Sequence, residues 1–306
     1  MTMEHTLPGG PAPGHLKVWI EASRPFSFTA SVTPVVIGSV LGALDGPFSW
    51  GRFFMALCGA LFIHIGTNMV NDYYDHQSGV DTLASQSGSQ VLPRQLLSPN
   101  AMYWGGIIAF VIGSVFGLML VRLCGWPILA LGVASVLAGY FYTARPLSLA
   151  YIALGEATVF VFMGTVIIIG AYYVQREMFA LAPVLISLPV GCLVAAILQA
   201  NNIRDIEADT SHGKNTLATL VGRRAANWEL AVLIYGAFVL TGLLVFSGYA
   251  PWSILLTFLS IRLAIPAVRR VFQEDELLGI DEQTAKLHLE YGALLIVGLL
   301  LSRFVG

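Results

Sequence analysis

The sequence is poor in charged residues. Only 11% of its 306 residues are Asp, Glu, Lys or Arg, whereas 56% are hydrophobic. Soluble domains carry about 25% charged residues, so this chain has too few to cover the surface of a water-soluble protein. Its formal net charge of −2 also gives no basic face for nucleic acid. We therefore expect no nucleic-acid partner, and a lipid bilayer as the solvent for much of the surface.

Cysteines and targeting signals are scarce too. The three cysteines match neither a metal-ligand spacing nor a disulfide framework. The N-terminus lacks the basic-then-apolar layout of a signal peptide. Residues 1–15 are rich in Pro and Gly, which predicts a flexible N-terminal segment. We expect the whole chain, 1–306, to form a single domain.

Long apolar runs recur along the rest of the chain. A helix needs about 20 apolar residues to cross the hydrocarbon core, and the runs lack the two-residue alternation of a membrane barrel. The fold is therefore predicted to be all-α and polytopic. Arg262 and Pro266 interrupt the eighth of nine predicted spans. The spans are 26–44, 53–71, 101–122, 126–143, 150–173, 179–200, 227–247, 251–268 and 287–305.

The basic residues are unevenly divided between the two ends of these spans. Of the 16 Lys and Arg residues, eleven fall on the side of the N-terminus, four on the other side, and Arg262 within a span. Lys and Arg accumulate on the cytoplasmic side of membrane proteins. The N-terminus is therefore predicted to face the cytoplasm, in a multi-pass protein of the cell membrane.

The first acidic segment follows the second predicted span, on the cytoplasmic side. Asn68, Asp72 and Asp75 share one helical face, at i, i+4 and i+7. Gly79 is expected to end this helix, so that Asp81 can fold back toward the same face. Two or three carboxylates would then meet at the membrane boundary.

The second acidic segment repeats this pattern after the sixth predicted span. Asn201, Asp205 and Asp209 share one helical face at i, i+4 and i+8, and Lys214 lies just beyond. Carboxylates near lipid are costly unless positive charge lies among them. Magnesium is commonly held by one or two carboxylates plus substrate phosphate oxygens. Two facing clusters would hold a diphosphate between magnesium ions, which would neutralise the leaving group.

The allylic cation left behind by a prenyl diphosphate needs a dry pocket with electron-rich walls. Tyr74 and Tyr142 are candidates for this wall, together with Tyr73, Tyr140 and Phe141.

These motifs resemble those of the UbiA superfamily of intramembrane aromatic prenyltransferases, over nearly the whole chain from Ser23-Arg24-Pro25 onward. Within it, the chain is most similar to the 1,4-dihydroxy-2-naphthoate polyprenyltransferases of menaquinone synthesis. The spacing of Asp72, Asp75, Gly79 and Asp81 is one basis for this likeness. The others are the stretches Tyr142-Thr-Ala-Arg145-Pro-Leu147, with Leu154-Gly-Glu156, and Asn201-Asn-Ile-Arg-Asp205, running on through Gly213-Lys214-Asn-Thr-Leu217 to Gly222.

The resemblance implies a nine-helix bundle with a central cavity and a cytoplasmic polar cap. It implies that Asp72, Asp75, Asp205 and Asp209 hold Mg²⁺ and diphosphate, and that a polyprenyl diphosphate and an aromatic acceptor are the partners. Asn68, Asn71 and Asn201 would support the carboxylates, and Arg145 and Lys214 would meet diphosphate oxygens. Asp81 or Glu156 would orient or deprotonate the acceptor phenol. Arg24, Arg204, Tyr74 and Tyr142 complete the substrate-binding candidates.

The stretch between Asp81 and Arg94 carries no charge, whereas relatives of the naphthoate type often carry charges there. The acceptor therefore stays open among 1,4-dihydroxy-2-naphthoate, a modified naphthoate, 4-hydroxybenzoate and homogentisate. A cation-coupled transporter is the alternative from another class, because intramembrane carboxylates also mark ion pathways. The oligomeric state is not determined by these patterns.

Overall fold

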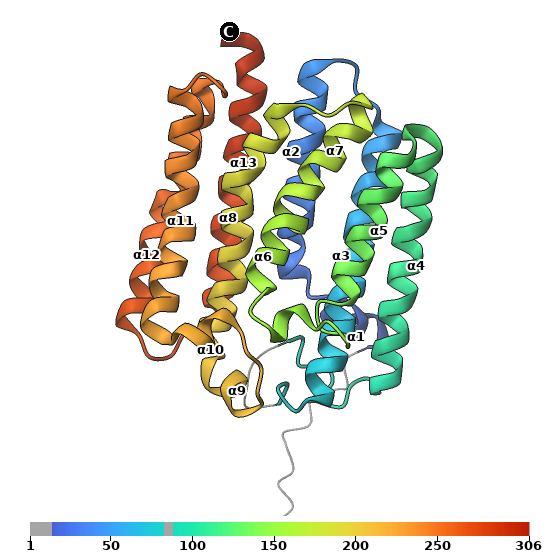
Figure 1. Cartoon of the computed structure of the whole chain (residues 1–306), viewed down its shortest axis with the longest axis vertical. Helices are drawn as coiled ribbons and strands as arrows, with labels where there is room; N and C mark the ends of the chain where they lie inside the picture. Colours follow the sequence, from blue (N-terminus) through green and yellow to red (C-terminus); the bar gives the residue numbers. More distant parts are fainter. Residues whose placement is uncertain (1–13, 83–87, 306) are drawn as a thin grey trace, which may run out of the picture.

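The computed structural model describes residues 14–82 and 88–305, and the described chain is a bundle of helices (Figure 1). Within these residues the one strand-like pairing is an isolated bridge between Ile152 and Asn215. The all-α fold is thereby confirmed. Of the segment expected to be flexible, only residues 14 and 15 are described, and His15 already begins a helix.

Seven helical stretches of the described chain are long and apolar enough to cross a membrane. Three of them are single uninterrupted helices in the first half or middle of the chain: α3 (Trp50–Gln77), α4 (Pro99–Cys124) and α8 (Leu181–Arg204). Two more close the bundle, α11 (Arg223–Phe246) and α13 (Ile280–Val305). The remaining two are composite: η1 (Pro25–Phe28) with α2 (Thr29–Asp45), and α6 (Gly155–Val159) with the π-helical η3 (Phe160–Val166) and α7 (Ile167–Arg176).

An eighth apolar helix, α5 (Trp126–Tyr140), is shorter. The predicted span 251–268 corresponds to the 3-10 helix η4 (Trp252–Ser260) followed by α12 (Ile261–Gln273). This pair lies outside the set of apolar spans, and it carries Arg262, Arg269 and Arg270. The structure therefore supports a polytopic protein with seven or eight apolar spans, and the ninth crossing stays a prediction.

Short helices gather at one end of the bundle, which we call the cap end. They are α1 (His15–Ala22), η2 (Leu149–Tyr151), α9 (Ile206–Ser211) and α10 (Leu217–Val221). Figure 1 shows α1, α9 and α10 together at the lower end, with the C-terminal end of α13 at the opposite end. Both acidic segments lie at the cap end, because α3 and α8 each finish there.

The two acidic segments differ in their backbone. Helix α3 continues without a break to Gln77, and Gly79 then adopts a left-handed conformation with φ of 78°. The helix thus ends where the sequence predicts. The second segment is interrupted instead, because Asp205 leaves helical geometry between α8 and α9. The i→i−4 bonds of a helix nevertheless continue through this point, because the Asp205 N–H donates to Asn201 O over 3.1 Å and the Asp209 N–H donates to Asp205 O over 2.8 Å.

Glycines allow α3 and α4 to pack closely. A Cβ atom on Gly66 would lie 2.9 Å from the backbone oxygen of Gly106, and one on Gly113 would lie 3.0 Å from that of Gly59. Small residues let helix backbones approach in lipid, where packing rather than the hydrophobic effect drives association. Because α3 carries the first acidic segment, this contact also sets the position of the site.

We predict that Gly66→Ala lowers the melting temperature of the purified protein in detergent, because the obstacle is a backbone atom that cannot rotate away. Overpacking of this kind costs about 1–3 kcal/mol. The matched control is Gly117→Ala on α4, where an added Cβ meets nothing within 4 Å. Equal melting temperatures for the two variants would contradict the close α3–α4 contact.

Candidate active site

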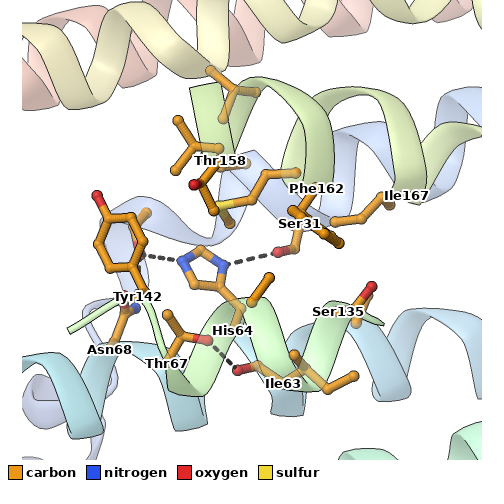
Figure 2. Close-up of a pocket in the computed structure, with 18 of the residues that line it drawn as sticks. Ser31, Ile63, His64, Thr67, Asn68, Ser135, Tyr142, Thr158, Phe162 and Ile167 are labelled. Carbon is orange, nitrogen blue, oxygen red and sulfur yellow. Dashed lines mark hydrogen bonds between the residues drawn. The ribbon is translucent and has the colours of Figure 1, made fainter. Parts of the chain in front are cut away.

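A cavity of about 310 Å³ opens at the cap end and extends between the helices. Its deeper walls are apolar and come mainly from α3, α4, α5, α7 and η3, for example at Ala60, Leu120, Leu131 and Phe162. Figure 2 shows part of this wall around His64 and Tyr142. Its polar lining includes Arg24, Ser27, Asn68, Asn71, Asp75, Tyr142, Asn201, Asn202, Lys214 and Asp281.

Asp72 is fully buried and held on both oxygens. The Arg24 guanidinium forms an ion pair with Oδ1, and the hydroxyl and backbone N–H of Ser89 donate to Oδ2. Burial alone would lower the pKa of Arg24, but the Asp72, Asp81 and Asp75 carboxylates outweigh burial and raise it. Asp72 is therefore already paired with Arg24, and it does not line the cavity.

Asp75 lines the cavity mouth one helical turn further along α3. Asn71 donates to Oδ2 over 2.9 Å, and the Tyr151 hydroxyl donates to Oδ1 over 2.7 Å. This bond contributes to a raised pKa of Tyr151, behind burial and the charge of Asp75, so the phenol stays protonated. Asn71 and Tyr151 thus each engage one oxygen of Asp75.

Arg204 organises the second acidic segment. Its guanidinium donates to both oxygens of Asp205 over 2.8 Å and to Asn201 Oδ1 over 2.5 Å. Its Nη1 also lies 2.8 Å from Asp281 Oδ2, at the start of α13. Because one planar guanidinium contacts all of them, the end of α8 and the start of α13 are held together.

Lys214 joins the two segments. Its Nζ lies 3.7 Å from Asp75 Oδ2 and 3.5 Å from Asp209 Oδ1, over the ring of Tyr151. Burial alone would lower the pKa of Lys214, but Asp75, Asp209 and Asp205 outweigh burial and raise it. The side chain therefore stays a cation at the point where the segments meet.

Asp209 is a buried carboxylate with no hydrogen-bond donor in the described chain to offset its loss of hydration. It is 1% exposed, and neither oxygen has a hydrogen-bond donor within the described residues. Burial raises the pKa of Asp209 to about 6; Lys214 opposes this shift, while Asp205 and Asp75 reinforce it. A buried carboxylate that is short of donors suits a hard cation.

These observations allow a test of whether the site suits magnesium. No group of three or more His, Cys, Asp or Glu residues in the described chain converges closely enough to hold a metal by itself. Magnesium does not need such a group, since it is usually bound by one or two carboxylates with substrate phosphates and water. Asp75 and Asp209 fit this requirement, whereas Asp72 and Asp205 are each paired with an arginine in this structure.

Asp81 and Glu156, the two predicted acceptor-side residues, lie apart from each other. The Asp81 backbone N–H donates to Asp75 O over 3.2 Å, so the chain folds back as expected and brings Asp81 beside Arg24 and Gly88. Glu156 is 6% exposed and accepts a 2.7 Å bond from Asn202, while its Oε2 has no donor in the described chain. Burial raises the pKa of Tyr142, and the nearby Glu156 raises it further.

Three predicted substrate-binding residues do not line the cavity: Tyr74, Arg145 and Arg204, the last of which is paired with Asp205 and Asp281. Arg145 is exposed in the loop after α5 and does not line the cavity. Tyr74 stacks edge-on against Tyr73, with ring centroids 5.1 Å apart, in an aromatic group that also includes Tyr103. Of the five aromatic residues expected to form the wall, Tyr142 alone lines the cavity among the described residues.

Several residues at the site were missed by sequence reasoning. Ser89 comes from the uncharged stretch after Asp81, of which residues 83–87 lie outside the described chain. Tyr151 and Asp281 contact the acidic segments from helices distant in sequence, and Asn202, within the second segment, donates to Glu156. Asn202 stands within the second acidic motif, and Asp281 is an acidic residue just before the last apolar run, whereas nothing in the sequence marked Ser89 or Tyr151.

Fold and site together define a multi-pass membrane protein in which a buried acidic and basic mouth opens into an apolar cavity. The model of the UbiA prenyltransferase family matches residues 31–288, and the chain belongs to this family. It is a membrane-bound prenyltransferase, which removes the transporter alternative.

Two relatives illustrate the likeness in sequence. The 1,4-dihydroxy-2-naphthoate octaprenyltransferase of Bacillus subtilis is 32% identical over 288 residues, which cover 93% of this chain and 92% of that protein. The UbiA prenyltransferase domain-containing protein 1 of Homo sapiens is 30% identical over 299 residues, covering 93% and 83%.

Solved structures share the fold at lower identity. A UbiA homolog from Aeropyrum pernix K1 superposes with a TM-score of 0.67 at 15% identity, covering 92% of this chain and 98% of that one. A UbiA homolog from Archaeoglobus fulgidus, solved bound to GPP and Mg²⁺, gives a TM-score of 0.60 at 16% identity, covering 91% and 99%.

We predict that Asp209→Asn abolishes prenyl transfer yet stabilises the protein at pH 7.5 without magnesium. The folded pKa of about 6 exceeds the ordinary value of 3.8, so the native state gains stability as pH falls through 6 and Asp209 takes up a proton. The melting temperature of Asp209→Asn should exceed that of the unsubstituted protein at pH 7.5, by a margin that shrinks at pH 5.5.

The matched control is Glu207→Gln, an exposed acidic residue of the same short helix, which should change neither activity nor stability. A lower melting temperature for Asp209→Asn at pH 7.5 would show that Asp209 serves the fold rather than the reaction.

Proposed function

We propose that this protein transfers a polyprenyl group from its diphosphate to 1,4-dihydroxy-2-naphthoate, with Mg²⁺, in menaquinone biosynthesis. The main support is the contact of Lys214 with Asp75 and Asp209, which brings the two acidic segments to one cavity mouth. That the Bacillus subtilis relative is a 1,4-dihydroxy-2-naphthoate octaprenyltransferase supports the choice of acceptor. Diphosphates and Mg²⁺ were bound in structures of the Archaeoglobus fulgidus homolog.

The charged mouth suits the diphosphate end of the donor. Arg24 and Lys214 would contact its phosphate oxygens, since each is a cation that lines the cavity, Arg24 half-buried and Lys214 buried. Asp75 and Asp209, with Asp72 and Asp205, would hold Mg²⁺. When bound, that ion neutralises charge developing on the departing diphosphate. The apolar part of the cavity would take the prenyl chain and exclude water from the cation.

The bond changes follow from this placement. The allylic C–O bond breaks, the diphosphate leaves with the electron pair, and the ring carbon that carries the acceptor's carboxylate forms a new bond to the allylic carbon. Tyr142 would line the path of the cation with its π face. Loss of carbon dioxide from the naphthoate would then return the electron pair that restores the aromatic ring.

Glu156 is the candidate for orienting or deprotonating the acceptor. Asn202 engages one of its oxygens, and the other is buried without a donor among the described residues. A phenol hydroxyl would satisfy this second oxygen. Asp81 lies beside Arg24 instead, so we assign it to the diphosphate side of the mouth.

We also propose that the protein crosses the membrane nine times, with η4 and α12 as the eighth crossing and the cap end in the cytoplasm. This arrangement agrees with the excess of Lys and Arg on that side. It also agrees with the opposite positions of α1 and the end of α13 (Figure 1).

Substitution of Asp75, the carboxylate of the first acidic segment that contacts Lys214, tests whether the cavity mouth binds the donor. We expect Asp75→Asn to lower kcat/KM for prenyl transfer on the order of 100-fold or more, as for loss of a group that stabilises developing charge. Glu177→Gln is the control, because Glu177 pairs with Arg52 and lies in neither acidic segment. Near-normal turnover by Asp75→Asn would count against the proposed site.

The acceptor is tested by mass spectrometry of products. Membranes containing the protein are incubated with Mg²⁺, one polyprenyl diphosphate and, separately, 1,4-dihydroxy-2-naphthoate, 4-hydroxybenzoate or homogentisate. We expect a prenylated, decarboxylated product from the naphthoate alone. Prenylation of 4-hydroxybenzoate or homogentisate in its place would reassign the acceptor and leave the transferase activity standing.

A further inference from the structure

His64 is a buried side chain in the cavity wall that the proposed chemistry does not use. It lies on α3, is 7% exposed, and lines the cavity. Figure 2 shows its ring between α3 and the segment that carries Ser31, with a hydrogen bond to Ser31. A histidine in such a place would ordinarily be a candidate acid or base.

In this structure both ring nitrogens of His64 are engaged by serine hydroxyls of the neighbouring segment. Nδ1 lies 2.8 Å from the Ser31 hydroxyl, and Nε2 lies 3.3 Å from the Ser27 hydroxyl. The Ser27 hydroxyl donates to the backbone oxygen of Arg24 over 2.8 Å, so it must accept from His64. We therefore assign the proton to Nε2 and let Nδ1 accept from Ser31.

The network leads from His64 to Arg24. Ser27 satisfies the carbonyl of Arg24 with both its hydroxyl and its backbone N–H. Asn68, one turn along α3, donates to the Ser27 hydroxyl over 3.1 Å and to the backbone oxygen of Ser23 over 3.0 Å. The residues on either side of Arg24 are thus held by one face of α3.

Arg24 needs this support because its backbone is strained. Its φ of 56° and ψ of 65° lie in the left-handed region, which is unfavourable for residues other than glycine. This conformation directs the side chain to Asp72, two turns beyond His64 on α3. His64, Asn68 and Asp72 stand at i, i+4 and i+8 on one face of α3. Their side chains therefore contact the segment around Arg24 at three successive turns of the helix.

We propose that His64 is a positioning residue that holds Arg24 at the cavity mouth through the Ser27 hydroxyl. This inference rests on the proposed role of Arg24 as a contact for diphosphate. The role itself requires the shape of the imidazole, which carries a donor and an acceptor on opposite sides, and requires no proton transfer.

The test measures binding of geranyl diphosphate to the purified protein with Mg²⁺, by titration calorimetry. His64→Leu removes both hydrogen bonds and should weaken binding about tenfold, the effect of a lost bond of ordinary strength. Ser27→Ala should weaken binding by a similar factor. It provides the test if His64→Leu fails to fold. His64→Gln retains a donor and an acceptor and should bind within about threefold of the unsubstituted protein.

Combination with Arg24→Gln separates positioning from general damage. If His64 acts through Arg24, then His64→Leu should cause no further loss in the Arg24→Gln background, because coupled residues are not additive. His288→Leu is the matched control. His288 is also buried and pairs with a hydroxyl, that of Thr29, but it does not line the cavity. Its loss should lower the melting temperature and leave geranyl diphosphate affinity unchanged.

The outcomes distinguish this inference from the proposed function. If Arg24→Gln weakens binding but His64→Leu and Ser27→Ala bind normally, or if the losses in the double variant multiply, the positioning role is overturned and the proposed function stands. If the unsubstituted protein binds no geranyl diphosphate, or Arg24→Gln binds it normally, the proposed diphosphate site fails as well.

Discussion

The site depends on one buried cation between two carboxylates. Lys214 reaches Asp75 from the first acidic segment and Asp209 from the second, and no other ion pair in the described chain links these segments. Buried carboxylates repel one another and lose hydration, so they can share a small volume only if positive charge lies among them. Lys214 supplies this charge and so allows the ends of α3 and α8 to meet.

The same requirement explains the two arginines. Arg24 is paired with Asp72, and Arg204 with Asp205 and Asp281. Asp209 has a raised pKa and no hydrogen-bond donor among the described residues, and it shares its one nearby cation, Lys214, with Asp75. The basic side chains therefore neutralise part of the negative charge at the cavity mouth, and a bound cation that prefers oxygen ligands would neutralise the rest. Beneath it the cavity turns apolar within a few helical turns, which suits a substrate with a charged head and a hydrocarbon tail.

Helix α3 determines most of this geometry. It is long enough to extend from the lipid-spanning region to the cap end, and close packing against α4 at glycine positions fixes its place. One of its faces then holds the Arg24 turn through His64, Asn68 and Asp72, while Asp75 faces Lys214. Helix α8 behaves differently, because its acidic segment breaks at Asp205 and directs Asp205 and Asp209 to different cations.

The sequence by itself determined the all-α membrane fold, the positions of the apolar helices and the two acidic segments, because hydropathy and helical spacing are local properties. It also determined the family, since the motifs stand at fixed distances along the chain. Only the tertiary structure decided which cation meets which carboxylate and that Arg145 and Tyr74 lie outside the cavity. It also decided that Ser89 and Tyr151 contact the first acidic segment and that Asp281 lines the cavity. Those contacts join residues far apart in sequence, and they depend on how the helices pack, which no local pattern records.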